Sequence, residues 1–146
     1  MASGWRRKSR EAALQLVYQV ELGGDRSEAS LERFWIRLPG ATDDARDYGK
    51  FLADVVFERM EQIDAAIERA TENWQIDRIS RVDLCLLRVA AGELVFVPET
   101  PARVVINEAV DIAKRFSGGG APAFINGVLD RIASAHGRLA DEGEVR

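Results

Sequence analysis

The fold class is decided by residues 100–116, TPARVVINEAVDIAKRF, which carry the local marks of an amphipathic helix. Thr100 suits a helix cap, and Pro101 suits the first helical position because its missing N–H would have no partner there. Lys114 and Arg115 favour the negative C-terminal end. One apolar stripe at intervals of three and four positions is formed by Val105, Ala109, Ile112 and Phe116. The stretch therefore predicts one helix with a buried side.

The same signals recur upstream of this stretch. A helix is expected over about residues 5–22, and Gly23-Gly24 would end it. Ser27 is a suitable N-cap for a second helix, which Pro39-Gly40 would end. Its apolar stripe is Leu31, Phe34, Trp35 and Leu38. The first third of the chain therefore predicts two helices joined by a glycine turn.

Further helices are expected in the middle and at the end of the chain. One begins near residues 42–43 and is expected to kink or break near Met60, where Arg59 interrupts the apolar stripe. Ser80 opens the next with a capping-box-like start. A glycine run, residues 118–120, precedes the last helix, which Pro122 opens.

Strand signals are almost absent, so the sequence predicts an all-α fold, a compact bundle of six or seven amphipathic helices. The length of 146 residues fits a single domain, assigned to residues 1–136. Residues 137–146 lack a periodic apolar pattern and are expected to fray.

Composition excludes several classes of protein. The chain is 47% hydrophobic and 30% charged, which is typical of a soluble globular protein, and no apolar run approaches the ~20 residues of a membrane-spanning helix. A single cysteine, Cys85, excludes an internal disulfide and a multi-cysteine zinc site. No secretory signal is present, so the expected location is a reducing cytoplasm.

The candidate catalytic residues do not combine into an active site. His136 is the only histidine and lies near the expected tail, which fits a surface residue better than a catalytic base. Cys85 lies among leucines and fits a packed thiol. The glycine run 118–120 lacks the lysine of a phosphate loop, and Glu108 and Asp111 share a helix face without a histidine that could complete a metal site. The sequence predicts no enzyme, no metal and no cofactor.

A basic cluster at the N-terminus is the feature that points to a ligand. It consists of Arg6, Arg7, Lys8 and Arg10. With these four removed, 16 basic residues face 24 acidic ones, a net charge of −8 on the rest of the chain. An acidic body with one basic end indicates a local anion site, and Trp5 beside it could stack on a base. Short basic N-termini that bind nothing are common, so the cluster alone leaves RNA or DNA binding open.

Four segments, in order and in register over about residues 5–133, resemble the NusB family of transcription antitermination factors. They are RRKSREAALQLVY (6–18), LRVAAGEL (87–94), PARVVINEAVDIAKRF (101–116) and FINGVLD (124–130). The first is similar to the family's arginine-rich opening, the third to its V-x-I-N-E-A-V helix and the fourth to its F-V-N-G-V-L-D motif. This resemblance implies an all-α adaptor of two packed three-helix-type subbundles.

The resemblance also implies partners. The family pairs with NusE, a small-subunit ribosomal protein, and the pair binds the single-stranded boxA element of rRNA operon transcripts. It works on the RNA polymerase elongation complex with other Nus factors. For the partner interface, Tyr18 and Asp83 match positions associated with NusE, although Tyr18 equally suits a core position. The acidic body is compatible with a basic ribosomal protein.

The resemblance assigns RNA contacts to Arg6, Arg7, Lys8 and Arg10, which would bind phosphates, and to Phe124 and Asn126. Phe124 would stack on a base and Asn126 would bind a base edge, but core packing is an equal alternative for Phe124. A structural role, a buried polar contact between helices, is expected for Asn107-Glu108.

Three positions depart from the family pattern. Ala123 stands where a lysine often precedes the phenylalanine, so one phosphate contact is missing. Gly92 and Ala102 stand where aromatic residues occur in relatives, which puts part of the partner interface in doubt.

Two alternatives stay open. One is a self-associating helical module, with a homodimer that hides the basic end. The other is a NusB-like accessory domain of an RNA methyltransferase, whose catalytic part would need a further ~200 residues.

Overall fold

The computed structural model describes residues 3–72 and 76–139. Its α-helices are α1 (Ser3–Glu21), α2 (Glu28–Arg37), α3 (Asp43–Glu58), α4 (Met60–Thr71), α5 (Arg81–Phe96), α6 (Ala102–Phe116) and α7 (Ala121–Ala135), with a 3₁₀ turn, η1 (Ile76–Arg78). No strand occurs in these two ranges, which confirms the all-α prediction. None of these helices is long and apolar enough to cross a membrane.

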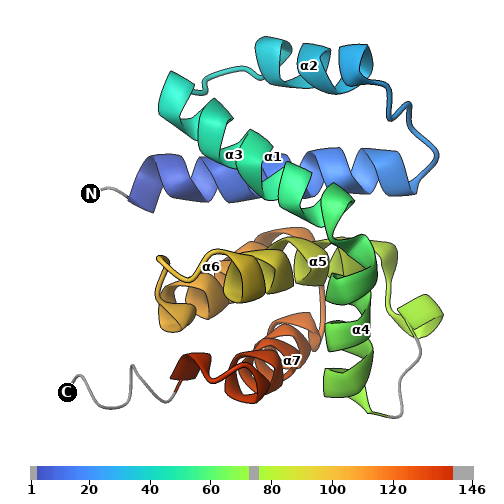
Figure 1. Cartoon of the computed structure of the whole chain (residues 1–146), viewed down its shortest axis with the longest axis vertical. Helices are drawn as coiled ribbons and strands as arrows, with labels where there is room; N and C mark the ends of the chain where they lie inside the picture. The colour runs from blue at the N-terminus through green and yellow to red at the C-terminus, as the bar shows by residue number, and fades with distance from the viewer. Residues whose placement is uncertain (1–2, 73–75, 140–146) are drawn as a thin grey trace.

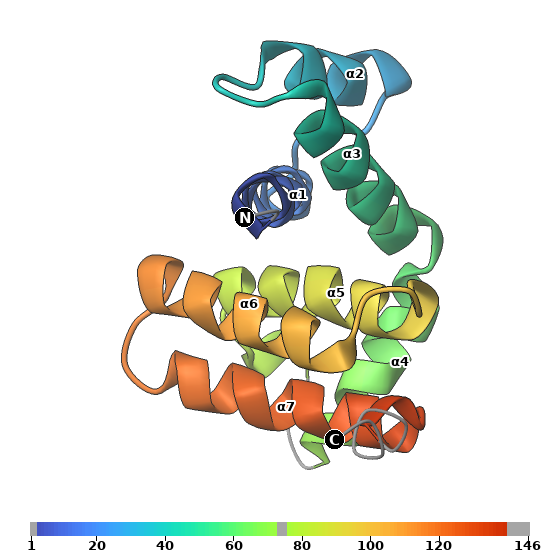
Figure 2. The same ribbon diagram turned by 90° about the vertical axis from the view of Figure 1, so that its left-hand side faces the viewer.

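The helices form two groups, which confirms the expected division of the fold (Figure 1). One group contains α1, α2 and α3, and the other contains α4, α5, α6 and α7, one helix more than a three-helix unit. Helix α1 packs against both α3 and α5, so it joins the groups. Figure 2 shows α5 and α6 between α1 and α7. Helix α5 is central, and every residue from Leu84 to Leu94 is buried.

Local capping signals place most helix starts correctly. The side chains of Ser27, Thr42 and Ser80 accept hydrogen bonds from the backbone N–H of the third residue beyond each. The expected break near Met60 is confirmed, since Arg59 is the non-helical residue between α3 and α4. Thr100 is wrong as a cap, because Pro101 precedes α6 and the Thr100 hydroxyl lies 3.3 Å from the Tyr48 hydroxyl.

The apolar stripe predicted over residues 105–116 is buried except at its end. Val105, Ala109 and Ile112 are buried, but Phe116 is 48% exposed at the end of α6. Cys85 is buried, as predicted, and burial raises the pKa of its thiol to about 11.

Fraying was expected from residue 137. Arg138 donates hydrogen bonds to the carbonyl oxygens of Leu94 and Thr100, and Leu139 packs against the core. Residues 137–139 are therefore held against the body, and the rest of the expected tail, 140–146, lies outside the described residues.

Candidate RNA and partner interface

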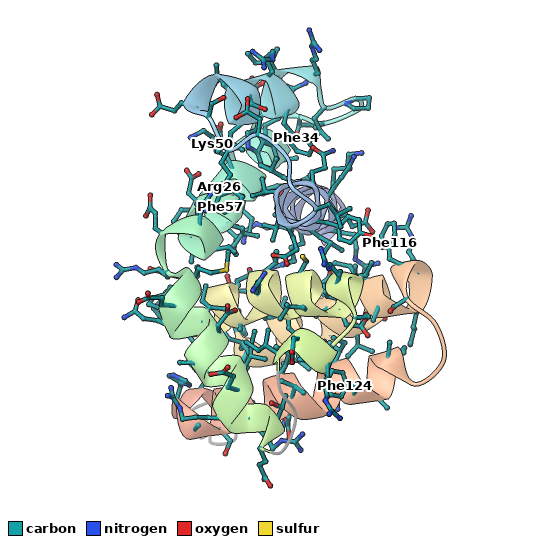
Figure 3. All side chains as sticks on the ribbon, turned by 90° about the vertical axis from the view of Figure 1, so that its right-hand side faces the viewer. Arg26, Phe34, Lys50, Phe57, Phe116 and Phe124 are labelled. Carbon is teal, nitrogen blue, oxygen red and sulfur yellow. The ribbon has the colours of Figure 1, made fainter. Side chains whose placement is uncertain are left out.

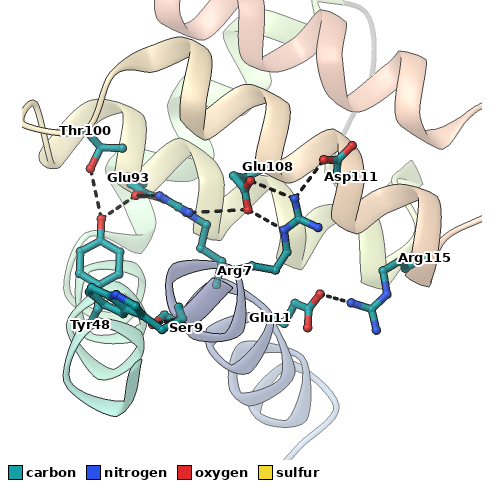
Figure 4. Close-up of polar contacts among 11 residues, drawn as sticks. Arg7, Ser9, Glu11, Tyr48, Glu93, Thr100, Glu108, Asp111 and Arg115 are labelled. Atoms are coloured by element: carbon teal, nitrogen blue, oxygen red, sulfur yellow. Dashed lines mark hydrogen bonds and ion pairs between the residues drawn. The ribbon is translucent and has the colours of Figure 1, made fainter. Parts of the chain in front are cut away.

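The four cations of the N-terminal cluster lie on different sides of α1. Arg10 faces the interior and is 5% exposed. Its Nε and Nη2 donate to the two carboxylate oxygens of Glu93 on α5, both at 2.8 Å (Figure 4). A buried charge is tolerated only with such a partner, so Arg10 is unsuited to the phosphate contact that the sequence predicted. Its place in the structure is that of a brace between α1 and α5.

Tyr48 of α3 completes this buried pair. Its hydroxyl donates to Glu93 Oε2 at 2.6 Å, and burial together with the Glu93 charge raises the pKa of the phenol. The Ser9 hydroxyl donates to the carbonyl oxygen of Ala45 at 2.8 Å. Side chains of α1 are thus bonded to α3 and α5 at the point where the two groups of helices meet.

Arg7 makes a second brace, to α6. Its Nε and Nη2 donate to the two oxygens of Glu108 at 2.6 and 2.9 Å, and Nη2 also reaches Asp111 Oδ2 at 3.0 Å. The hydrogen bond from Arg7 lowers the pKa of Glu108. The expected polar contact between helices is therefore present for Glu108, although Asn107 is exposed and the prediction is wrong there.

Arg6 and Lys8 are left with accessible cationic groups. The Arg6 guanidinium lies over the rings of Trp5 and Tyr48, 4.7 and 4.4 Å from their centroids. Lys8 forms no ion pair within the described part of the chain, and it lines two neighbouring grooves beside α1. These two cations, unlike Arg7 and Arg10, remain available to an anion from solution.

Phe124 and Asn126 lie on α7, on the far side of the α5–α6 layer from α1 (Figure 2). The structure therefore does not bring them together with the basic cluster. Phe124 is half-buried and packs against the core, and Asn126 is exposed. Ala123 is also exposed, so the missing lysine would have pointed away from the core. Figure 3 shows Phe124 and Phe116 on the same side of the molecule.

Tyr18 lies in an apolar groove where α1 meets the start of α5 and the end of α6. The groove encloses about 270 Å³, and Lys8, Tyr18, Leu38, Val82 and Phe116 are among its lining residues. Asp83 follows Val82, and its carboxylate accepts a hydrogen bond of 2.5 Å from the Ser117 hydroxyl. Tyr18 therefore lines the groove, whereas Asp83 is the neighbour in sequence of one of its lining residues. Gly92 and Ala102 are buried and line no part of it.

Several interior ionic residues were missed from the sequence. Arg88 of α5 is buried and is bonded to Asp64 of α4 at 2.9 Å and to Glu21 of α1 at 2.8 Å. Arg88 and Glu93 are the charged residues in the otherwise apolar stretch 84–94, and that interruption was the available signal.

Comparison with known proteins identifies this fold. The NusB family model matches residues 7–134. The transcription antitermination protein NusB of Sorangium cellulosum is 42% identical over 136 residues, 93% of this chain and 96% of that protein. NusB of Geobacter sulfurreducens is 41% identical over 140 residues, 96% of this chain and 99% of that protein.

Solved structures agree with the sequence relatives. NusB of T. maritima superposes with a TM-score of 0.83 at 33% identity, covering 96% of this chain and 97% of that one. A chain from the crystal structure of the antitermination factors NusB and NusE in complex with dsRNA gives a TM-score of 0.80 at 29% identity, covering 90% of this chain and 97% of that one. The chain belongs to the NusB family of transcription antitermination proteins.

Proposed function

We propose that this protein is a non-enzymatic cytoplasmic adaptor that pairs with NusE and binds single-stranded boxA RNA of rRNA operon transcripts. The pair would act on the RNA polymerase elongation complex together with other Nus factors. The observation that carries the proposal is the apolar groove lined by Tyr18 and by Val82, the residue before Asp83, in a chain of this family. The relatives bear the name of the antitermination protein, which does not favour a methyltransferase accessory domain.

The groove has the properties of a protein-binding surface. Its lining is mainly apolar, and the half-exposed Phe116 ring at its edge offers a large hydrophobic contact. Aromatic residues in such positions carry much of the binding energy in protein interfaces. The net charge of −4 would also speed encounter with a basic ribosomal protein.

Binding of NusE to Phe116→Ala by isothermal titration calorimetry tests this surface. The truncation should weaken binding by about tenfold, the loss expected for one aromatic contact of about 1.4 kcal/mol. Ile36→Ala is the matched control, since Ile36 is 66% exposed on α2 and does not line the groove. Equal affinity of the two variants would exclude the groove as the NusE site.

For RNA, we propose that Arg6 and Lys8 bind phosphates and that Phe124 and Asn126 contact bases. Arg7 and Arg10 then act indirectly, because their ion pairs hold the first turns of α1 against α5 and α6. The choice of single-stranded boxA comes from the family resemblance, since the RNA in the matching complex is double-stranded.

Fluorescence anisotropy of a labelled boxA-type RNA, with and without NusE and across a salt series, tests RNA binding. NusE should enhance binding, and the log–log salt slope should fall by about 0.7 for each phosphate that Arg6→Ala/Lys8→Ala no longer neutralises. Arg69→Ala/Arg78→Ala, which removes two exposed cations on α4 and η1, is the control. If NusE has no effect and both variants bind like wild type, the RNA adaptor fails, and a self-associating helical module, detected by sedimentation, becomes the better description.

A further inference from the structure

A second groove runs between α1 and α2, on the other side of Lys8 from the groove at Tyr18. It encloses about 380 Å³. Side chains of α1 and α2 line it, among them Lys8, Gln15, Gln19, Arg33, Phe34 and Arg37. No carboxylate is among the lining residues, although acidic residues outnumber basic ones in the chain. A groove of purely positive charge on an acidic protein points to an anionic ligand.

The cations of this groove are not committed to internal ion pairs. Many other arginines of the protein do form ion pairs with carboxylates. Examples are Arg7, Arg10, Arg88 and Arg115, the last of which pairs with Glu11. Within the described ranges, by contrast, the groove cations Lys8, Arg33 and Arg37 take part in no ion pair. Asp25 attracts Arg33 from beyond ion-pair distance, while its own oxygens accept hydrogen bonds from Ser27.

Helix α2 separates its charges in a way that supports this groove. Arg33 and Arg37 are four positions apart and share a side with Ser30, toward α1. Glu28 and Glu32 are also four apart but lie on the opposite side of the helix. The two arginines therefore face α1 without a carboxylate of their own helix beside them.

We propose that the α1–α2 groove binds the backbone of single-stranded RNA, with Lys8 as one of its phosphate contacts; the proposal rests on the RNA-binding function above. Lys8 lines the groove and is also one of the two cations assigned to phosphates above. From Lys8 to Gln19, α1 rises about 16 Å at 1.5 Å per residue. That length accommodates several nucleotides at about 3.4 Å each in a stacked strand.

The remaining lining groups suit RNA better than an acidic polypeptide. The amides of Gln15 and Gln19 both donate and accept, as base edges require, and both side chains are exposed. Phe34 is half-buried, and its ring lies edge-on to the Trp35 ring, with 4.9 Å between the two ring centroids. Figure 3 shows Phe34 on the side of α2 toward α1. A fixed aromatic ring in a basic groove is a stacking platform for a base.

The test compares two double variants of the full chain by anisotropy of a labelled single-stranded boxA-type RNA across a salt series. Arg33→Gln/Arg37→Gln removes the groove charge, and Arg69→Gln/Arg78→Gln removes the same charge from α4 and η1. The groove variant should bind about tenfold or more weakly at 0.1 M salt, with a log–log slope lower by about 1.4, whereas the control keeps the wild-type slope. A 4-thiouridine-substituted RNA should crosslink to the peptide that contains Phe34.

Three outcomes separate the hypotheses. Equal salt slopes of the two variants, with no crosslink to that peptide, overturn the groove proposal while wild-type RNA binding stands. The proposal is also overturned if the groove variant keeps the wild-type salt slope for RNA but no longer binds poly-glutamate. That result would assign the groove to an acidic polypeptide. No RNA binding by the wild type with NusE would instead refute the proposed function itself.

Discussion

At the residue scale, Arg7 and Arg10 differ from Arg6 and Lys8 because their side chains form ion pairs with α6 and α5. Arg10 lies three positions before Ala13 and seven before Val17, so it continues the buried stripe of α1 toward the N-terminus. Inside the protein its charge requires a partner, and Glu93 supplies one. Burial works to lower the pKa of Arg10, but the hydrogen bonds and charge of Glu93 outweigh it, so the pKa is raised.

Replacement of Arg10 by alanine therefore tests stability rather than RNA affinity. The variant would leave the Glu93 carboxylate buried without a cation, which costs about 3–5 kcal/mol of unfolding free energy. Urea denaturation measures this loss. The double variant Arg10→Met/Glu93→Leu should recover most of it, because no unpaired charge remains. Unchanged stability together with weaker RNA binding in Arg10→Ala would show that Arg10 contacts phosphate after all.

The sequence could locate the basic cluster but could not identify the partners of its buried arginine, Arg10. Four cations in little more than one turn predict an anion site, and extension of the apolar stripe could have singled out Arg10. No local pattern, however, identifies Glu93 and Tyr48 as its partners, because they lie 83 and 38 positions away and only the tertiary fold brings them there.

At the scale of elements, α2 shows how a short helix is attached. Its N-cap Ser27 was predictable because the hydrogen bond is local, within three residues. The contact of α2 with α3 depends on Trp35, which is 4% exposed. The Trp35 ring packs against Gly49 of α3. The prediction for Thr100 is wrong because its contact is not local. Its hydroxyl lies within hydrogen-bond distance of the Tyr48 hydroxyl, 52 positions away in the sequence.

Gly49→Ala should loosen α2. A β-carbon at Gly49 would lie 2.8 Å from the Trp35 ring and 3.1 Å from the Ser9 carbonyl oxygen, closer than van der Waals contact. Such overpacking costs about 1–3 kcal/mol, despite the better helix propensity of alanine. The unfolding free energy and the tryptophan fluorescence of the folded protein measure the effect.

Gly127→Ala is the matched control in α7. A β-carbon there would meet only the Arg131 guanidinium, at an ordinary van der Waals distance of 3.8 Å, so the variant should be more stable by about 0.5–1 kcal/mol. A Gly49→Ala protein that gains stability as the control does would contradict the packing of Trp35 on α3.

At the scale of the whole molecule, ion pairs connect α1 to the second group of helices along much of its length. Arg7 bonds to Glu108, Arg10 to Glu93, and Glu21 accepts from Arg88. The sequence predicted the helices and their division, since both follow from local periodicity and from the family resemblance. It could not predict how the inward-facing charges pair, because the partners Glu108, Glu93 and Arg88 lie far along the chain from Arg7, Arg10 and Glu21.

Because the Arg7–Glu108 ion pair joins α1 to α6, the stability of the contact between the two groups of helices depends on the charge of Glu108 and therefore on pH. The hydrogen bond from Arg7 lowers the pKa of Glu108 below its ordinary value of 4.5. A lowered pKa contributes stability that is fully present above the unfolded value, about 4.5, and that is lost as the pH falls through the folded value. The unfolding free energy should therefore decrease below about pH 4.5.

Glu108→Gln isolates that contribution. At pH 7 the variant should be less stable than wild type by about 1–2 kcal/mol, because the charged acceptor of Arg7 is gone. The difference should shrink as the pH falls below 4.5, when wild-type Glu108 also becomes neutral. Urea denaturation between pH 3 and 7 measures both curves. In an Arg7→Met background the pH-dependent difference should largely vanish, and its persistence there would mean that another group, not Arg7, holds the Glu108 carboxylate in its charged form.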